Sequence, residues 1–356
     1  MNNIVNFPQS NPYFTQESDL YFDTWERPCY FKGNGDKYYE DPTKKHIVRM
    51  LDNKPHSLGV VGKNYQKLST KELCQSVEQE YIGSLTHEQL NGVLVVDKTA
   101  YHGGLCIRQY IFPNIKAELE SRVSDVAFRT VIINGYDGSS SFKFYNGAID
   151  FWCENGMVTG IYDMMVKKHT KGLTIPKLTD KIKSSIDIFY KQAEQWNRWI
   201  GKEISDDNAK ECFEAIPNAS ERFVEKLMRQ FHKECFSHGR TVWALYSAAT
   251  YYASNSNGEF SVRATSQDHT ASTLMHREKQ IRSWVSTDSF QQLAASEVRM
   301  KEGDLVTQDP NTTDRMTIIE YVKGDQTIGE EDTVHCELAN GSHDWFRANE
   351  VWRIYK

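Results

Sequence analysis

The sequence predicts an α+β fold in which long helices pack on an antiparallel sheet, followed by a small C-terminal β-barrel. Three observations support this prediction. Apolar runs separated by turn residues fill 92–153, helical periodicity dominates the middle of the chain, and short β runs return near the end. Because 356 residues exceed one typical core, we expect more than one domain. We place an N-terminal arm at 1–50, a core domain at 51–298 and an SH3-like barrel at 302–356.

The first half of the chain should form one helix and then the sheet. Residues 1–50 are polar and weakly periodic, which predicts an irregular arm. A helix is expected over 70–90, with Ser69 or Thr70 as its N-cap. Strands follow at 92–98, 101–112, 124–134 and 140–153, joined as two antiparallel hairpins with a bulge at Gly103–Gly104 and a turn at Tyr136-Asp137-Gly138.

Helices should cover this sheet. The segment from Pro176 to Ile204 has the clearest pattern, because its apolar residues recur at spacings of three and four. Pro176 lies near the start, where its missing N–H costs nothing. Further helices are expected at 206–216 with Asp206 or Asp207 as cap, after Ser220, at 240–253 and at about 270–285. The helix at 240–253 is apolar nearly all round, so it should be buried.

The last 55 residues differ in pattern and in charge. Short β runs separated by turns such as Asn340-Gly341 predict the barrel. Twelve acidic residues face six basic ones in 301–356, so this segment holds the whole net charge of −6. Within the neutral remainder, residues 160–183 carry six lysines against two aspartates, which makes them the strongest basic cluster.

Several classes of protein are disfavoured. No stretch approaches the length of about 18 apolar residues that a membrane span needs, and the N-terminus does not resemble a secretory signal. The seven cysteines are scattered, which is typical of reduced thiols in the cytoplasm. Phosphate-loop and dinucleotide motifs are absent, and His232, Cys235 and His238 lack the further ligands of a zinc site. We therefore expect neither cofactor nor metal.

One motif resembles a known family. The sequence has an Asn-x-x-Asp-Gly-Ser turn, a Cys-x-Asn-Gly corner and a basic exit segment. These are the patterns of the phage- and plasmid-encoded family called domain of unknown function 932, and the resemblance covers roughly residues 50–295. It implies a mobile-element protein in the cytoplasm of a phage-infected or plasmid-bearing bacterial cell, and it assigns no mechanism. The matching positions are Asn134, Asp137, Gly138, Ser139, Cys153, Asn155, Gly156, Lys168, His169, Thr170 and Gly172.

The leading functional hypothesis is a non-enzymatic protein that binds single-stranded DNA in recombination or replication. Clustered lysines can contact phosphates, and nearby aromatic rings can stack on bases. Binding to a host protein and assembly into a homo-oligomer are further possibilities that the sequence leaves open. The candidate DNA-binding residues are Lys167, Lys168, His169, Lys171, Lys177, Lys181, Phe144 and Trp152.

Two alternatives belong to other classes. Asp137, Cys153 and His169 could form the site of a hydrolase or transferase with a thiol nucleophile. Turn formation explains Asp137 equally well, and Cys153 fits a buried core position. The other alternative is a host-interaction or anti-defence protein whose acidic C-terminal domain imitates nucleic acid.

Overall fold

A computed structural model describes most of the chain, in two compact units. The units span Met1–Ala294 and Ala295–Lys356. Among the described residues, no helix is both long and apolar enough to cross a membrane. The described residues are 13–14, 17–119, 125–150, 155–157, 163–171, 173, 178–262, 269–295, 305–307, 315–322, 333–347 and 352–353.

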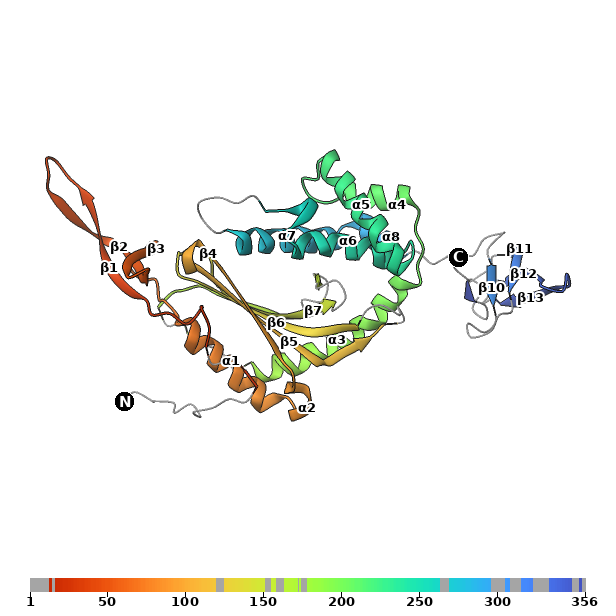
Figure 1. Cartoon of the computed structure of the whole chain (residues 1–356), viewed down its shortest axis with the longest axis horizontal. Coiled ribbons are helices and arrows are strands. Elements are labelled where there is room, and N and C mark those ends of the chain that lie inside the picture. Colours follow the sequence, from red (N-terminus) through yellow and green to blue (C-terminus); the bar gives the residue numbers. More distant parts are fainter. Residues whose placement is uncertain are drawn as a thin grey trace. The chain divides into compact units, whose positions relative to one another are not determined.

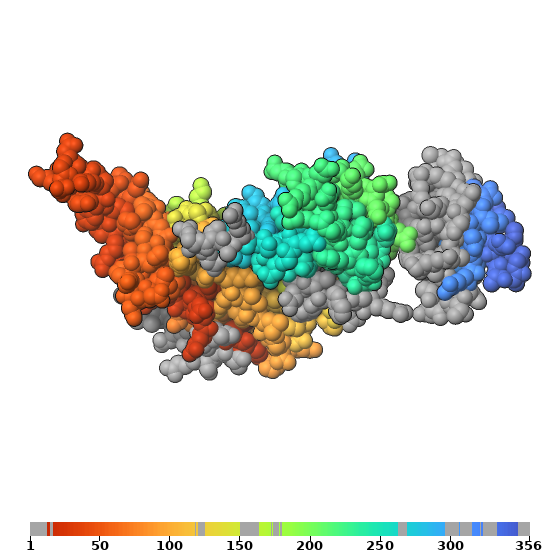
Figure 2. Space-filling model, turned by 45° about the horizontal axis from the view of Figure 1, so that its top comes forward, coloured from red at the N-terminus to blue at the C-terminus, as the bar shows by residue number. Residues whose placement is uncertain are grey.

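The first unit begins with a three-stranded antiparallel sheet, formed by β1 (Trp25–Lys32), β2 (Tyr38–Leu51) and β3 (Lys54–Gly62). The prediction of an irregular arm is therefore wrong for β1 and β2. Their outer halves project from the unit and are exposed on both faces, so no apolar alternation marks them as strands (Figure 1). Figure 2 shows the same hairpin as a protrusion from the body of the first unit.

The central sheet confirms the two predicted antiparallel hairpins. Its order is β4-β5-β6-β7-β8, and β9 pairs with the other half of β7. No bulge lies at Gly103–Gly104, since residues 101–103 form a 3₁₀ turn and the register shift lies between Phe112 and Lys116. The bounds are β4 (Leu94–Ala100), β5 (Leu105–Glu118), β6 (Asp125–Gly135), β7 (Phe142–Asp150), β8 (Asn155–Met157) and β9 (Asp163–Lys167).

Two of the helices lie across one face of this sheet (Figure 1). In α1 (Thr70–Ser84), Ser69 is the N-cap and accepts a hydrogen bond from the backbone of Glu72, as predicted. The predicted helix over 70–90 is interrupted, because a separate short helix, α2 (His87–Leu90), follows. The long helix is α3 (Thr179–Ile200), shorter at both ends than the segment predicted from Pro176 to Ile204.

The remaining helices lie on the other side of the sheet (Figure 1). The cap of the first is Ser205 rather than either predicted aspartate, because its hydroxyl accepts from the Asn208 backbone while Asn208 reaches back to it. The buried helix predicted at 240–253 is confirmed, at Val242–Ser254. The helix at Asp288–Ala295 was not predicted. The bounds are α4 (Asp206–Glu214), α5 (Glu221–His238), α6 (Val242–Ser254), α7 (Thr270–Val285) and α8 (Asp288–Ala295).

The central sheet is therefore buried on both faces. One face packs against α1 and α3 through large rings such as Phe112, Phe128 and Phe142. The opposite face presents smaller apolar side chains, including Ile107, Val131 and Ile133, towards α7. Because side chains alternate along a strand, each strand contributes to both layers. This second face carries the candidate site.

The second unit contains a small antiparallel sheet of order β13-β12-β11-β10-β14. Val306, Ile318, Val334 and Cys336 form its buried core. The predicted Asn340-Gly341 turn is present, with Gly341 at a positive φ of 77°. No described pairing joins β13 to β14, so the sheet is not shown closed as a barrel. The bounds are β10 (Leu305–Thr307), β11 (Met316–Val322), β12 (Thr333–Leu338), β13 (His343–Arg347) and β14 (Trp352–Arg353).

Candidate functional site

The motif residues after β6 form the turn that the sequence predicted. The Asp137 carboxylate accepts hydrogen bonds from the backbone N–H of Ser139 at 2.8 Å and from its hydroxyl at 2.7 Å. Gly138 has a φ of 78°, which a residue without Cβ adopts without strain. Local turn chemistry therefore accounts for Asp137, Gly138 and Ser139.

Asn134 and its neighbour Tyr136 fasten this region to helix α1. The Asn134 side-chain amide donates to the Leu68 carbonyl at 3.1 Å and to the Thr70 hydroxyl at 2.9 Å. The Tyr136 hydroxyl accepts from the Thr70 backbone N–H at 2.8 Å. Both side chains are fully buried, so these bonds offset much of the cost of removing polar groups from water, although the Asn134 amide oxygen is buried without a partner.

His169 also has a structural position. Its Nδ1 lies 3.1 Å from the Gln66 carbonyl, and its ring stacks on Tyr65 with centroids 4.8 Å apart. The Tyr65 hydroxyl in turn donates to the Gly135 carbonyl. Burial lowers the pKa of His169 and outweighs the opposing effects of the hydrogen bond to Gln66 and of Asp137. A covered, neutral imidazole does not fit the proposed phosphate contact.

The structure describes only part of the alternative catalytic set. His169 and Asp137 interact electrostatically, but the Asp137 carboxylate is engaged by Ser139. Cys153 lies outside the described residues, as do Trp152, Gly172 and Lys177. The backbone of Asn155 and Gly156 forms part of β8.

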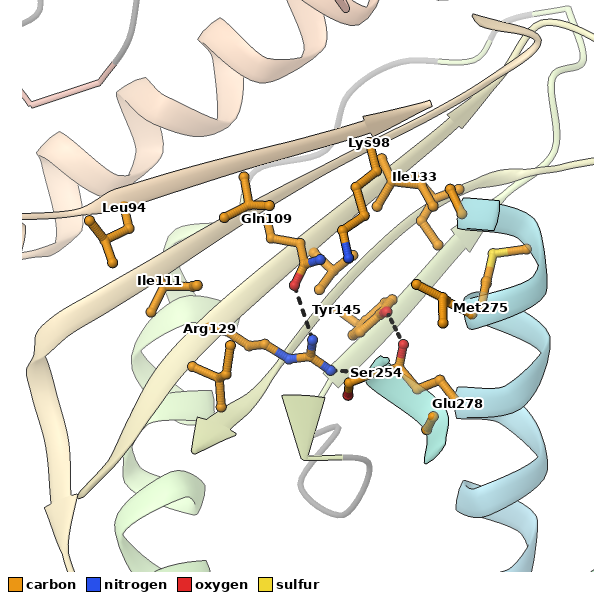
Figure 3. A pocket seen from close by; sticks show the side chains of 17 residues that line it. Leu94, Lys98, Gln109, Ile111, Arg129, Ile133, Tyr145, Ser254, Met275 and Glu278 are labelled. Atoms are coloured by element: carbon orange, nitrogen blue, oxygen red, sulfur yellow. Dashed lines mark hydrogen bonds and ion pairs between the residues drawn. The ribbon is translucent and has the colours of Figure 1, made fainter. Parts of the chain in front are cut away.

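A pocket of about 330 Å³ lies between the second face of the central sheet and helices α6 and α7. Its floor consists of alternate residues of β4, β5, β6 and β7, and its roof comes from the end of α6 and one side of α7 (Figure 3). Most of the wall is aliphatic: Leu94, Val96, Ile107, Ile111, Val131, Ile133, Ile149, Leu274 and Met275.

Polar side chains converge inside this pocket (Figure 3). Arg129 donates to the carboxylate of Glu278 at 2.6 Å and to the side-chain oxygen of Gln109 at 3.1 Å. The Tyr145 hydroxyl donates to the other oxygen of Glu278 at 3.2 Å. Lys98 faces the same space, and its pKa is lowered by burial and by Arg129, against the opposing effect of Glu278.

Several cationic side chains lie beside the pocket, near the end of the sheet. Lys143 is opposite Ile133 in the pairing of β6 and β7, on the pocket face of the sheet. Burial, Lys279 and Arg282 lower the pKa of Lys143, so the two α7 side chains lie near it. We call Lys143, Lys167, Lys168, Lys279 and Arg282 the basic edge.

Lys167 and Lys168 are exposed at the end of β9, which pairs with β7 beside Lys143. Lys171, three residues further on, is exposed as well. Within the part of the chain that the structure describes, no residue of the basic edge forms an ion pair. The basic edge therefore carries uncompensated positive charge.

A family model described as "Domain of unknown function (DUF932)" matches residues 57–282. The chain belongs to this family. No curated protein and no solved structure matches the chain. The DUF932 domain runs from β3 to α7, so it contains the motif, the pocket and the basic edge, while β1, β2 and the C-terminal sheet lie outside it.

Sequence reasoning identified only some of the exposed cations of the DUF932 domain. It identified Lys167, Lys168 and Lys171, which are exposed. Side chains alternate along β7, and Phe144 points into the core against α3. It has no exposed surface, so it is not available to stack on a base. Lys181 lies in the first turn of α3, half-buried.

Sequence reasoning missed the other cations of the DUF932 domain, because Lys143, Lys279 and Arg282 are far apart along the chain. It also missed the pocket residues. The one available signal was Arg129, a single charge inside the apolar run of β6. In the described ranges, no three His, Cys, Asp or Glu side chains lie close enough to hold a metal ion.

Proposed function

We propose that this DUF932 protein binds single-stranded DNA along the basic edge and acts without catalysing a reaction. The observation that carries the proposal is a group of cations without a described acidic partner: Lys143 lies near Lys279 and Arg282 of α7, and Lys167 and Lys168 are exposed where the neighbouring strand β9 ends. Phosphates bind such clusters and release their counterions, which makes the affinity depend steeply on salt.

The surface beside these cations also suits a single strand. Met164 and Val166 lie on β9, opposite Tyr145 and Lys143, and are 46% and 49% exposed. Their side chains therefore offer apolar contact next to the phosphate-binding groups. Single-strand sites combine a basic track with surfaces on which bases can lie. A rigid duplex needs no such apolar strip, so the strip favours the single strand.

We further propose that the protein serves recombination or replication of a phage or plasmid inside the bacterial cytoplasm. The family resemblance supports this context. In the second unit, we propose that the small sheet closes as an SH3-like barrel. Residues 301–356 hold the whole net charge of −6, so this segment should repel DNA and lower the rate of association.

The test is binding of the full chain to a fluorescent oligothymidine across a salt series. In the test variant, Lys167, Lys168 and Lys279 become glutamine, since all three are exposed and can be replaced at little cost to folding. Each lost phosphate contact should lower the slope of log affinity against log salt by about 0.7. We therefore expect weaker binding and a slope reduced by about 2.

A matched control replaces three exposed lysines on other surfaces, Lys71, Lys191 and Lys210, with glutamine. This control changes the net charge equally, so it separates a local contact from a general charge effect. We expect its slope to equal that of the unmodified protein. Equal slopes in the test and control variants, or no binding at low salt, would contradict the proposal.

A further inference from the structure

The pocket above the central sheet has the composition of a binding site for a small molecule. Its aliphatic wall encloses about 330 Å³, at the lower end of the range of ligand sites. The polar groups lie together rather than scattered, with Arg129, Glu278 and Tyr145 connected by hydrogen bonds (Figure 3). This arrangement provides one apolar region and one polar region.

The polar region has a surplus of positive charge. Lys98 and Arg129 contribute two formal positive charges and Glu278 contributes one negative charge, and all three line the pocket. The Arg129 side chain is only 5% exposed, and its Nε–H is buried without an acceptor. A buried donor without a partner is costly, so the site has one missing acceptor and one uncompensated charge.

We infer that this pocket binds a small molecule with an apolar body and a single carboxylate, which lies against Arg129 and Lys98. One carboxylate supplies both the missing acceptor and the balancing negative charge. A phosphate monoester would bring up to about two negative charges, more than the surplus. A nucleobase fits the wall less well, because Tyr145 is the only aromatic side chain among the lining residues.

The mouth of the pocket suits such a ligand. Leu94 and Val96 line the pocket from β4 and are 50% and 36% exposed, so apolar surface continues to the outside. An aliphatic chain that follows this surface removes it from water, which favours binding. The inference goes beyond the proposed DNA binding, because it concerns this pocket rather than the basic edge.

The test measures binding of octanoate to the full chain by isothermal titration calorimetry, with octanol and octylamine as probes of equal chain length. We expect saturable binding of octanoate. A charge-assisted hydrogen bond distinguishes the acid from the alcohol, so octanol should bind about tenfold to a hundredfold more weakly. Octylamine should bind least, because its cation meets Lys98 and Arg129.

Two variants locate the binding. Arg129→Gln should weaken octanoate about tenfold or more, but it also leaves Glu278 without its ion pair and thus affects folding. Val96→Trp avoids this cost, because it fills the half-exposed mouth and removes no charge. Its matched control is Val60→Trp, at a similarly exposed position of β3 outside the pocket.

We expect Val96→Trp to abolish octanoate binding and Val60→Trp to preserve it. The inference is wrong if octanol binds as tightly as octanoate, if no octanoate binds, or if both tryptophan variants bind it equally. Oligothymidine binding is measured separately on the same proteins. Failure of the octanoate test with intact DNA binding therefore rejects the pocket inference alone.

Discussion

Gly59→Ala tests how the motif turn is fastened to the rest of the DUF932 domain. Gly59 lies in β3, where it pairs with Ile47, and its backbone passes directly over the Asp137 turn. A Cβ at this position would lie 2.5 Å from Asp137 Cα and 2.7 Å from its carbonyl oxygen. Both contacts are with backbone atoms, so a side-chain rotation cannot relieve them and a segment must shift. Overpacking of this kind costs about 1–3 kcal/mol.

The assay is urea denaturation followed by circular dichroism, with Gly62→Ala as the control. Gly62 lies at the end of the same strand, and a Cβ there would meet nothing within 4 Å. We expect Gly59→Ala to lower the free energy of unfolding by about 1–3 kcal/mol, and Gly62→Ala to change it by less than about 0.5 kcal/mol. Equal unfolding midpoints for the two variants would refute the close approach of β3 to the turn.

Two other predictions concern a turn and a buried histidine. Gly138→Val should destabilise the protein by about 1–3 kcal/mol, because its φ of 78° strains a β-branched residue and its Cβ would lie 3.0 Å from Val61 Cγ1; an unchanged melting temperature would contradict this. Burial lowers the pKa of His238 to about 4, although the Glu234 carboxylate lies 3.8 Å from its Nε2. Between pH 6.5 and 4 the unfolded chain therefore binds a proton that the folded chain does not. Stability should fall by up to about 3 kcal/mol as the pH drops through this window, and His238→Gln should remove this dependence in denaturation curves.

The elements that the sequence predicted well are those with one buried face and one exposed face. Helix α3 buries Ile182, Phe189 and Trp196, whose spacing follows the helical period. Strands β1 and β2 lack such a contrast, because their outer residues, including Tyr30 and Tyr38, are exposed on both sides. The outer parts of β1 and β2 are held together by backbone hydrogen bonds between the two strands. Such bonds produce no periodic pattern of apolar residues in the sequence.

The motif was predicted as a turn because its geometry is local. Asp137 and Ser139 are two residues apart, and Gly138 between them is required by its own φ. The bonds that give Asn134 its role are not local, since Thr70 lies 64 residues earlier. A single sequence therefore identifies the turn and leaves the function of the neighbouring asparagine open.

The polar residues of the pocket also could not be grouped from the sequence, because they are far apart along the chain. β6 is buried along nearly its whole length, so an arginine within it predicts a buried partner. The partner, Glu278, lies 149 residues later on a helix whose exposed side is rich in charge, and nothing near it in sequence distinguishes it from its neighbours. The third charge, Lys98, comes from β4. Only when the fold brings the three elements together does the count of two cations against one anion appear, and this count is what selects a monoanionic ligand.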